Sequence, residues 1–113
     1  MESLALRAIA EPRRRAILQL VIDRELTAGA IAAQFEVTRP AISQHLRILE
    51  AAGLVAVRRQ GTRRYYSARS EGLQELRETL EGFWEGRLRL LQHAAEAEEA
   101  GAPKGGSDGI EGA

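Results

Sequence analysis

Polar and cationic side chains lie on the outer face of a short helix that is predicted to begin after Thr38. Ile42, Leu46 and Leu49 are spaced four and three residues apart, which places them on one buried face of this helix. Arginine pairs with guanine, and glutamine with adenine, through two hydrogen bonds each, so the outer face has the residue types that reading the DNA major groove requires. The predicted reading residues are Thr38, Arg39, Pro40, Ser43, Gln44, His45 and Arg47.

Four arginines are concentrated in a β-hairpin that is predicted directly after this helix. In residues 55–57 valine alternates with alanine as in a half-buried strand, Gln60-Gly61 supplies the turn, and residues 62–66 return as a second strand. Mutual repulsion among the arginines would be costly without an anionic partner, and a phosphate backbone is the obvious one. The two consecutive tyrosines of the second strand must face opposite ways, so one is expected under the reading helix and the other on the outer face. The predicted contacts of this wing are Arg58, Arg59, Gly61, Thr62, Arg63, Arg64 and Tyr65.

Three helices are predicted to hold the reading helix in place. The first covers residues 2–10, the second has Pro12 in its first turn, and the third is capped by Thr27. The third helix is rich in alanine, which permits a close approach to the reading helix. Gly53 is expected to end the reading helix as a left-handed residue.

Three consecutive arginines, Arg13 to Arg15, lie in the first turn of the second helix, where the helix dipole disfavours positive charge. They either touch phosphate or form salt bridges to nearby acids such as Asp23 or Glu11. For at least two of them we favour the structural role.

The last predicted helix runs from Ser70 to about residue 97, and its ~27 residues would be ~40 Å long. This length exceeds what a small core can cover, so its apolar stripe needs a partner surface, and a second copy of the chain is the simplest source. The predicted dimer-interface residues are Leu4, Leu76, Leu80, Phe83, Trp84, Leu88 and Leu91. A homodimer would present two reading helices to a palindromic site with half-sites about 34–36 Å apart. A role for Phe83 and Trp84 in an effector pocket is the less favoured alternative.

Composition limits the classes of protein that the chain can belong to. Its 113 residues fit one small domain, which we expect over residues 1–97, followed by a flexible, acidic, glycine-rich tail over 98–113. The net charge is zero, yet residues 39–69 hold seven arginines against one acid, a local charge of +6. Cysteine is absent, which excludes thiolate metal sites and disulfides. No apolar run approaches the roughly 18 residues of a membrane span, so a cytoplasmic protein is expected.

Four segments of the chain together resemble the ArsR family of bacterial winged-helix regulators, in particular its cysteine-free branch. They are LRAIAEPRRRAILQLV, ELTAGAIAAQFEVTRPAISQHLRILEAAGLV, VRRQGTRRYYS and FWEGRLRLL, and the resemblance covers roughly residues 4–92. It implies a mainly α fold with a two-stranded β wing, a winged helix-turn-helix that dimerises through its terminal helices. It also implies a homodimeric transcriptional repressor that binds a palindromic operator in its own or a neighbouring promoter until an effector, a small molecule or a protein, releases it.

The chain departs from patterns within that family at two places. Zinc-binding members use an Asp-x-His pair on one chain and a His-x-x-Glu pair on the other. This chain has His93-x-x-Glu96 but holds Leu80 and Gly82 where the other pair belongs, so we predict no metal and no cofactor. Glu36 occupies a turn position where glycine is common, so the backbone is expected to be strained or locally different there.

Several alternatives to a DNA-binding repressor follow from the same residues. The chain could be a winged-helix module that acts mainly through protein contacts, or a repressor that responds to zinc through His93 and Glu96. His45 could be a half-buried packing residue as readily as a DNA contact. No catalytic set is found, because Ser43, Gln44 and His45 are adjacent on one helix and no acid is placed to orient the histidine. We therefore do not expect an enzyme.

Overall fold

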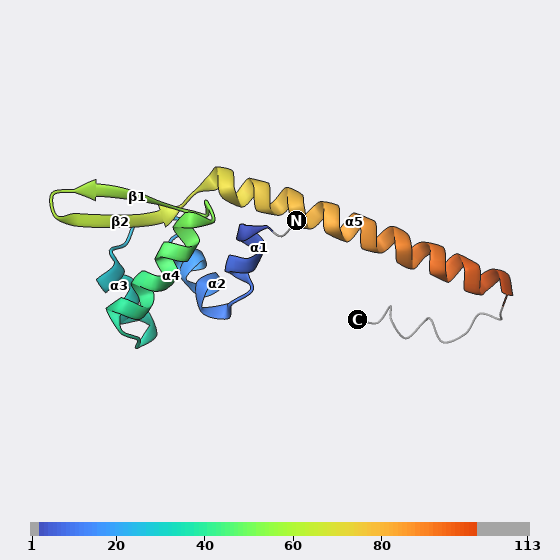
Figure 1. Cartoon of the computed structure of the whole chain (residues 1–113), viewed down its shortest axis with the longest axis horizontal. Helices are drawn as coiled ribbons and strands as arrows, with labels where there is room; N and C mark the ends of the chain where they lie inside the picture. Colours follow the sequence, from blue (N-terminus) through green and yellow to red (C-terminus); the bar gives the residue numbers. More distant parts are fainter. Residues whose placement is uncertain (1–2, 102–113) are drawn as a thin grey trace. The chain divides into compact units, whose positions relative to one another are not determined.

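The computed structural model describes residues 3–101 of the chain. These residues fall into two units, one up to Arg77 and a second from Glu78 onwards, and each is described by itself. The elements follow one another as five helices and one hairpin (Figure 1): α1 (Leu4–Ile9), α2 (Pro12–Leu20), α3 (Ala28–Phe35), α4 (Arg39–Ala51), β1 (Val55–Gln60), β2 (Arg63–Ala68) and α5 (Ser70–Gly101). The predicted fold class, mainly helical with a two-stranded antiparallel wing, is confirmed.

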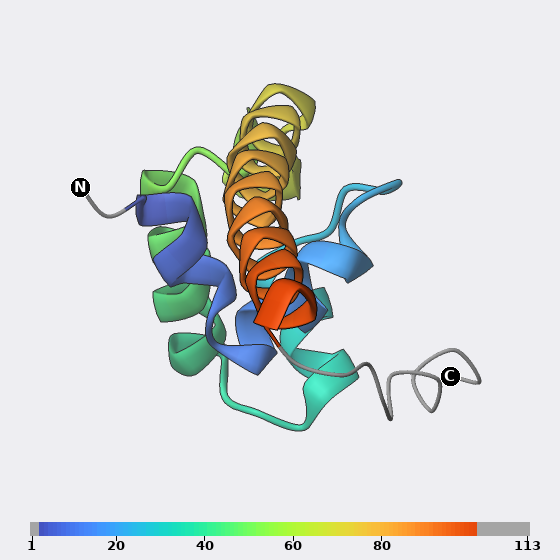
Figure 2. The ribbon, with the colours of Figure 1, turned by 90° about the vertical axis from the view of Figure 1, so that its right-hand side faces the viewer.

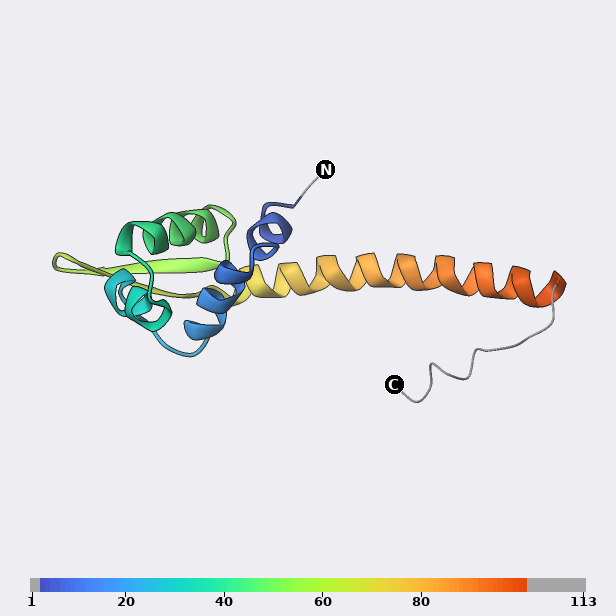
Figure 3. The same cartoon turned by 90° about the horizontal axis from the view of Figure 1, so that it is seen from below.

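Helix α4 is the centre of the first unit. It contacts α1, α2, α3 and β1, and α1 runs beside it in Figure 2, while Figure 3 shows it lying along the hairpin. Ile42, Leu46 and Leu49 are the buried residues of α4, as their spacing predicts. The largest fully buried side chains of the described chain come from α2, α3 and α4 and from the segments that directly follow α2 and α4: Ile17, Val21, Ile31, Ile42, Leu46, Leu49 and Leu54.

Side-chain caps fix where α3 and α4 begin. The Thr27 hydroxyl accepts a hydrogen bond from the Ala30 amide at 3.2 Å, and the Thr38 hydroxyl accepts one from the Ala41 amide at 3.3 Å. Each bond satisfies a first-turn amide that has no acceptor within its own helix. Both predicted caps are therefore confirmed.

The end of α4 is set by Gly53, which has a φ of 77°. The Gly53 amide donates to the Glu50 carbonyl at 2.9 Å and the Leu54 amide donates to the Leu49 carbonyl at 3.0 Å. This pair of bonds is the Schellman arrangement, in which a left-handed residue turns the chain out of the helix. It delivers Leu54 into the core and starts β1 at the next residue.

The wing turns one residue later than the sequence predicts. Gln60 pairs with Arg63, so the turn residues are Gly61 and Thr62 rather than Gln60 and Gly61, and β2 continues to Ala68. Gly61 has a φ of 62°, whereas Thr62 does not have a positive φ. That pattern is typical of a type II′ hairpin turn, which needs glycine at its first central position, and this requirement sets the register.

The turn between α3 and α4 is left-handed at Glu36, with φ 55° and ψ 41°. Among residues 3–101 no other non-glycine residue has a positive φ. The expected local departure at Glu36 is confirmed, and it costs about 1–2 kcal/mol because a Cβ crowds the following carbonyl in this conformation.

Helix α5 extends four residues beyond its predicted end, to Gly101. Its 32 residues correspond to about 48 Å at 1.5 Å per residue. The predicted tail therefore does not begin at residue 98, and its remainder, 102–113, lies outside the described residues. Within residues 3–101, no helix combines the length and the apolar character needed to cross a membrane.

The first turn of α5 packs tightly on the end of α4 at Gly72. A Cβ on Gly72 would overlap the Gly53 carbonyl oxygen, which is backbone and cannot rotate away. The Arg69 amide, just before α5, donates to the Leu54 carbonyl at 2.8 Å and holds the same corner. Sequence reasoning did not identify this contact.

We expect Gly72→Ala to lower the free energy of unfolding by about 1–3 kcal/mol, because the added methyl group must displace backbone. Gly82→Ala is the matched control, since no atom lies within 4 Å of a Cβ at that position of the same helix. It should raise stability by about 0.5–1 kcal/mol through helix propensity alone. Urea denaturation followed by circular dichroism measures both, and a Gly72→Ala protein as stable as Gly82→Ala would contradict the packing argument.

Candidate nucleic-acid interface

The outward face of α4 carries most of the residues predicted to read DNA. Gln44 and Arg47 are exposed on the middle of the helix, and Ser43 is half-buried beside them. The first turn adds exposed Arg39 and Pro40 after the exposed cap residue Thr38. The buried apolar face fixes this orientation, because residues on the opposite side of the helix must then face solvent.

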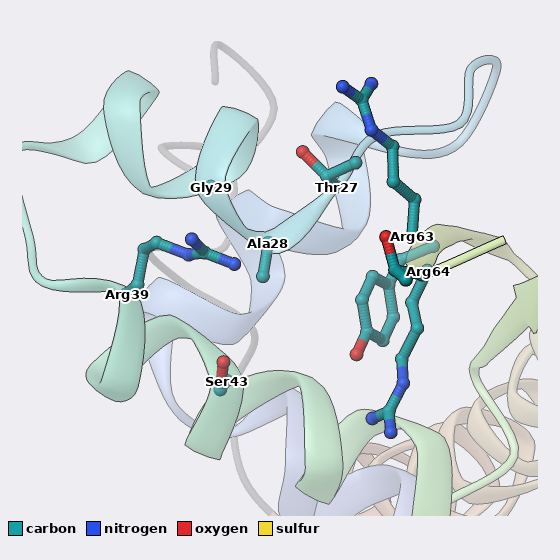
Figure 4. A pocket seen from close by; sticks show the side chains of 9 residues that line it. Thr27, Ala28, Gly29, Arg39, Ser43, Arg63 and Arg64 are labelled. Atoms are coloured by element: carbon teal, nitrogen blue, oxygen red, sulfur yellow. The ribbon is translucent and has the colours of Figure 1, made fainter. Parts of the chain in front are cut away.

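A cleft of about 610 Å³ opens where the N-terminal ends of α3 and α4 meet the wing (Figure 4). Three arginines and no acidic residue line it, together with hydroxyl-bearing and small residues: Thr27, Ala28, Gly29, Arg39, Ser43, Thr62, Arg63, Arg64 and Tyr66. Residues of α4 and residues of the wing, which were predicted as separate contact surfaces, thus line the same cleft. Its composition favours an anionic occupant.

Sequence reasoning missed the contribution of α3 to this cleft. Thr27, Ala28 and Gly29 form the start of that helix, where the first amides have no acceptor within the helix and carry the positive end of its dipole. In Figure 4 the Arg39 side chain points toward this helix start. The signal was present in the sequence, because a threonine cap followed by small residues leaves the end of a helix open to a ligand.

The arginines of the first unit divide sharply by partner. Within residues 3–77, the arginines to which the structure gives no hydrogen bond, ion pair or ring contact are Arg39, Arg47, Arg59, Arg63 and Arg64. All five lie on α4 or the wing. In this unit, arginine side chains without a partner are thus confined to α4 and the wing, and three of the five line the cleft.

Arg58 does not belong to this unpaired group, because it has partners within its own chain; its predicted phosphate contact stays a prediction. Its Nε donates to both carboxylate oxygens of Glu25, at 3.1 and 3.0 Å, and its Nη2 donates to Oε1 at 2.9 Å. Its Nη1 donates to the Gln60 side chain at 2.9 Å, and its guanidinium lies 4.8 Å from the centre of the Tyr65 ring. The anionic partner that the sequence demanded for this arginine is an acid of the same chain, from the segment between α2 and α3.

The two tyrosines of β2 lie on opposite faces, as predicted. Tyr66 is 8% exposed and belongs to the core, whereas Tyr65 is half-buried beneath Arg58. The backbone of Tyr66 also pairs with Leu26 through two hydrogen bonds, 2.8 and 3.0 Å long. Tyr65 therefore supports the outer face of the wing beneath Arg58, and its predicted DNA contact stays a prediction.

His45 faces α2 rather than the outer side of α4. It is half-buried, and its Nδ1 lies 3.5 Å from Nη1 of Arg14. This geometry fits the packing interpretation, and the assignment of His45 as a reading residue stays a prediction. His45 is half-buried because it stands one residue before buried Leu46, on the edge of the apolar face.

Arg13 to Arg15 all have structural partners, but these are not the predicted acids. Arg14 Nε donates to the Ala8 carbonyl at 2.6 Å, and Arg15 Nη1 donates to the Ile9 carbonyl at 2.7 Å. Arg13 lies over the Phe35 ring, 5.1 Å from its centre. The cations at the start of α2 thus satisfy the carbonyl end of α1, where the dipole favours positive charge.

The predicted dimer-interface residues fall into two groups. Leu76 is only 8% exposed and is already buried by its own chain. Leu80 is half-buried, and the others are more than half exposed: Leu4, Phe83, Trp84, Leu88 and Leu91. In the second unit the rings of Phe83 and Trp84 meet edge to face, 5.5 Å apart. An apolar surface of this kind is typical of a protein contact site.

His93 and Glu96, the half of a zinc site found in the sequence, have no further metal-binding side chain grouped with them in the described part of the chain. Glu96 accepts a hydrogen bond from the Gln92 side chain at 3.3 Å. Within residues 3–101 no three histidines or acids are grouped so that they could hold a metal ion.

Comparison with known proteins identifies the family. Residues 11–57, from α2 into β1, match the model of the bacterial regulatory proteins of the arsR family. The HTH-type transcriptional regulator Rv2034 of Mycobacterium tuberculosis is 44% identical over 80 residues, which cover 71% of this chain and 75% of that protein. The chain belongs to the ArsR family.

Other ArsR-family relatives agree with the fold. The transcriptional repressor SdpR of Bacillus subtilis is 42% identical over 69 residues, covering 61% of this chain and 77% of the repressor. The homodimeric winged helix-turn-helix DNA-binding domain Mb0332 of Mycobacterium bovis superimposes with a TM-score of 0.60 at 32% identity, over 73% of this chain and 76% of that one. The resemblance inferred from the sequence is thereby confirmed, together with the winged helix-turn-helix architecture.

The contact between Glu25 and Arg58 predicts a pH-dependent contribution to stability. Hydrogen bonds from Arg58 hold the pKa of the Glu25 carboxyl below its usual range. Because folding then favours the ionised form, the contribution is present at neutral pH and is lost as the pH falls below about 4. We expect Glu25→Gln to lower the melting temperature at pH 7 and to have a progressively smaller effect as the pH is lowered towards 3.

Thermal unfolding between pH 7 and pH 3 tests this expectation. Asp23→Asn is the control, because Asp23 is well exposed and contacts only its neighbour Arg24, at 3.4 Å. A difference between wild type and Glu25→Gln that widened on acidification would have the wrong sign.

Proposed function

We propose that this ArsR-family protein is a homodimeric transcriptional repressor that binds a palindromic operator in its own or a neighbouring promoter. Helix α4 enters the major groove, and the wing contacts the phosphate backbone beside it. The observation that carries the proposal is the set of five unpaired arginines around an acid-free cleft on α4 and the wing. A DNA backbone supplies the repeated negative charge that such a surface needs.

The residues of this surface divide by the part of DNA that they suit. Gln44 and Arg47 lie on the exposed middle of α4 and have the side chains for adenine and guanine edges. Arg59, Arg63 and Arg64 lie on the wing and suit phosphates, which position the protein without reading sequence. The cleft lined by Arg39 and the start of α3 suits a further phosphate between these two regions.

The homodimer is supported by the exposed apolar stripe of α5 and by the homodimeric Mycobacterium bovis domain. Leaving Phe83, Trp84 and Leu88 in water is unfavourable, and pairing two copies of the stripe removes them from it. Two copies of α4 then match two half-sites about one helical turn apart on the DNA.

Fluorescence anisotropy on a duplex from the region upstream of the gene and on a scrambled duplex, across a salt series, tests the function. We expect a preference of about a hundredfold or more for the upstream duplex. Gln44→Ala should reduce that preference by about 1–3 kcal/mol without changing the salt dependence, because it removes a base contact and no phosphate contact. Gln19→Ala, at an exposed position on α2, is the control. Equal binding of the wild type to both duplexes would contradict sequence-specific recognition.

Trp84→Ala should weaken the dimer and, through it, DNA binding. Trp84 is 57% exposed in the single chain and lies among the apolar residues of the α5 stripe. Arg89→Ala is the control, because Arg89 is also exposed but lies about 100° or more around the helix from each apolar residue of the stripe, at 100° per residue. Sedimentation velocity over a dilution series measures both, and an unchanged profile for Trp84→Ala at low concentration would exclude the interface role.

A further inference from the structure

The outer part of the wing has few attachments to the rest of the molecule. Residues 59–64 are all exposed. Apart from the pairing of β1 with β2, these residues form one hydrogen bond with the other described residues, in which Gln60 accepts from Arg58. They form no ion pair with those residues. Arg59, Arg63 and Arg64 therefore lie on the projecting end of the hairpin. The direction of this end is set by the contacts that the base of the hairpin makes with the rest of the chain.

Two contacts hold that base, one for each strand. On β2, the Tyr66 backbone pairs with Leu26 of the α2–α3 segment. On β1, Arg58 reaches across the Tyr65 ring to Glu25, the residue before Leu26. The segment between α2 and α3 thus contacts both strands, at the level of Tyr65 and Tyr66, beyond which the wing is exposed.

The second contact depends on the length and shape of both side chains. Neighbouring strands lie about 4.8 Å apart, so a side chain of β1 must span about 10 Å to reach beyond β2. The long arginine and glutamate side chains cover this distance together, and the planar fork of the arginine meets both carboxylate oxygens of Glu25. Every nitrogen of the Arg58 guanidinium is engaged, with Glu25 or with Gln60. A lysine would keep the charge but lose the fork.

The contact between Glu25 and Arg58 affects how positive charge is distributed over the two faces of the hairpin, because neighbouring residues of a strand point to opposite faces. Arg58 shares its face of the hairpin with Tyr65, whereas Arg59 and its partner Arg64 lie on the other face, with buried Val55 and Tyr66. Arg63, which pairs with Gln60 on the opposite strand, lies on the same face as Arg58 but nearer the turn. Glu25 therefore neutralises the arginine at the base of the outer face and leaves Arg63, Arg59 and Arg64 unpaired.

We propose that Glu25 and Arg58 are positioning residues. Their contact fixes the angle between the wing and the rest of the first unit, and so the direction from which Arg59, Arg63 and Arg64 meet DNA phosphates. The same contact keeps Arg58 itself off the DNA. This inference rests on the proposed function of the wing. It differs from a phosphate role for Arg58 in one measurable respect, since a positioning residue affects affinity without releasing a counterion of its own.

The test compares the salt dependence of DNA affinity in Arg58→Gln, Glu25→Gln and Arg64→Gln proteins, on the upstream and scrambled duplexes. Arg64→Gln should lower the slope of log affinity against log salt by about 0.9 for each wing bound. Arg58→Gln should leave the slope unchanged and lower affinity for the upstream duplex about two- to fivefold, the range that an exposed paired contact supports. Arg58→Lys should recover only part of this loss.

Glu25→Gln gives the distinguishing result. The substitution frees Arg58, so the slope should rise by up to about 0.9 for each wing, affinity for the scrambled duplex should increase, and the preference for the upstream duplex should fall. Melting temperatures identify any variant that fails to fold. If Arg58→Gln does not fold, the comparison of Glu25→Gln and Arg58→Lys with the wild type tests the inference.

Two results would overturn the inference while leaving the proposed function intact. One is a slope that falls in Arg58→Gln as it does in Arg64→Gln, since Arg58 would then be a phosphate contact. The other is wild-type affinity for the upstream duplex in both Arg58→Gln and Glu25→Gln. Failure of the wild type to bind either duplex would instead remove the proposed function, and this inference with it.

Discussion

The burial of one face of α4 is the constraint on which the rest of this structure depends. Ile42, Leu46 and Leu49 are almost fully buried, and the helix that carries them is in contact with three other helices and a strand. A helix held on so many sides cannot rotate without exposing core side chains to water. The direction of Gln44 and Arg47 is therefore as fixed as the core itself, and a surface that reads DNA needs that rigidity.

Charge is organised around this helix by giving most other arginines a partner. Arg14 and Arg15 bind carbonyl groups at the end of α1, Arg13 stacks on Phe35, and Arg58 is held by Glu25. The chain as a whole is neutral, yet within residues 3–77 the arginines whose side chains have no partner all lie on α4 or the wing, and three of them line one cleft. Net charge is thus a poor guide to this protein, because the sign of a surface depends on which charges are already satisfied.

Local signals in the sequence predicted the elements well. The caps at Thr27 and Thr38 and the left-handed residue Gly53 depend on neighbours within a few positions, so the chain itself reveals them. The family resemblance drew on the same order of elements.

Partners distant in sequence were predicted less well. Glu25 and Arg58 are brought together by the pairing of Leu26 with Tyr66, and no periodic pattern announces that contact. The same holds for Gly72 against Gly53, and for the start of α3 in the cleft. The contacts of Arg58 with Glu25 and of His45 with Arg14 were missed for one reason: both partners are distant in sequence, so the pattern of residues does not reveal them.

The pairing of Leu26 with Tyr66 also bears on the order in which the protein folds. A two-stranded hairpin is marginal in water by itself, and this one is pinned by a residue that precedes the whole helix-turn-helix. Closing that long loop costs entropy that is recovered only when the helices between its ends pack. The wing therefore forms with the core rather than ahead of it, and a partly folded chain does not present a finished cationic surface to nucleic acid.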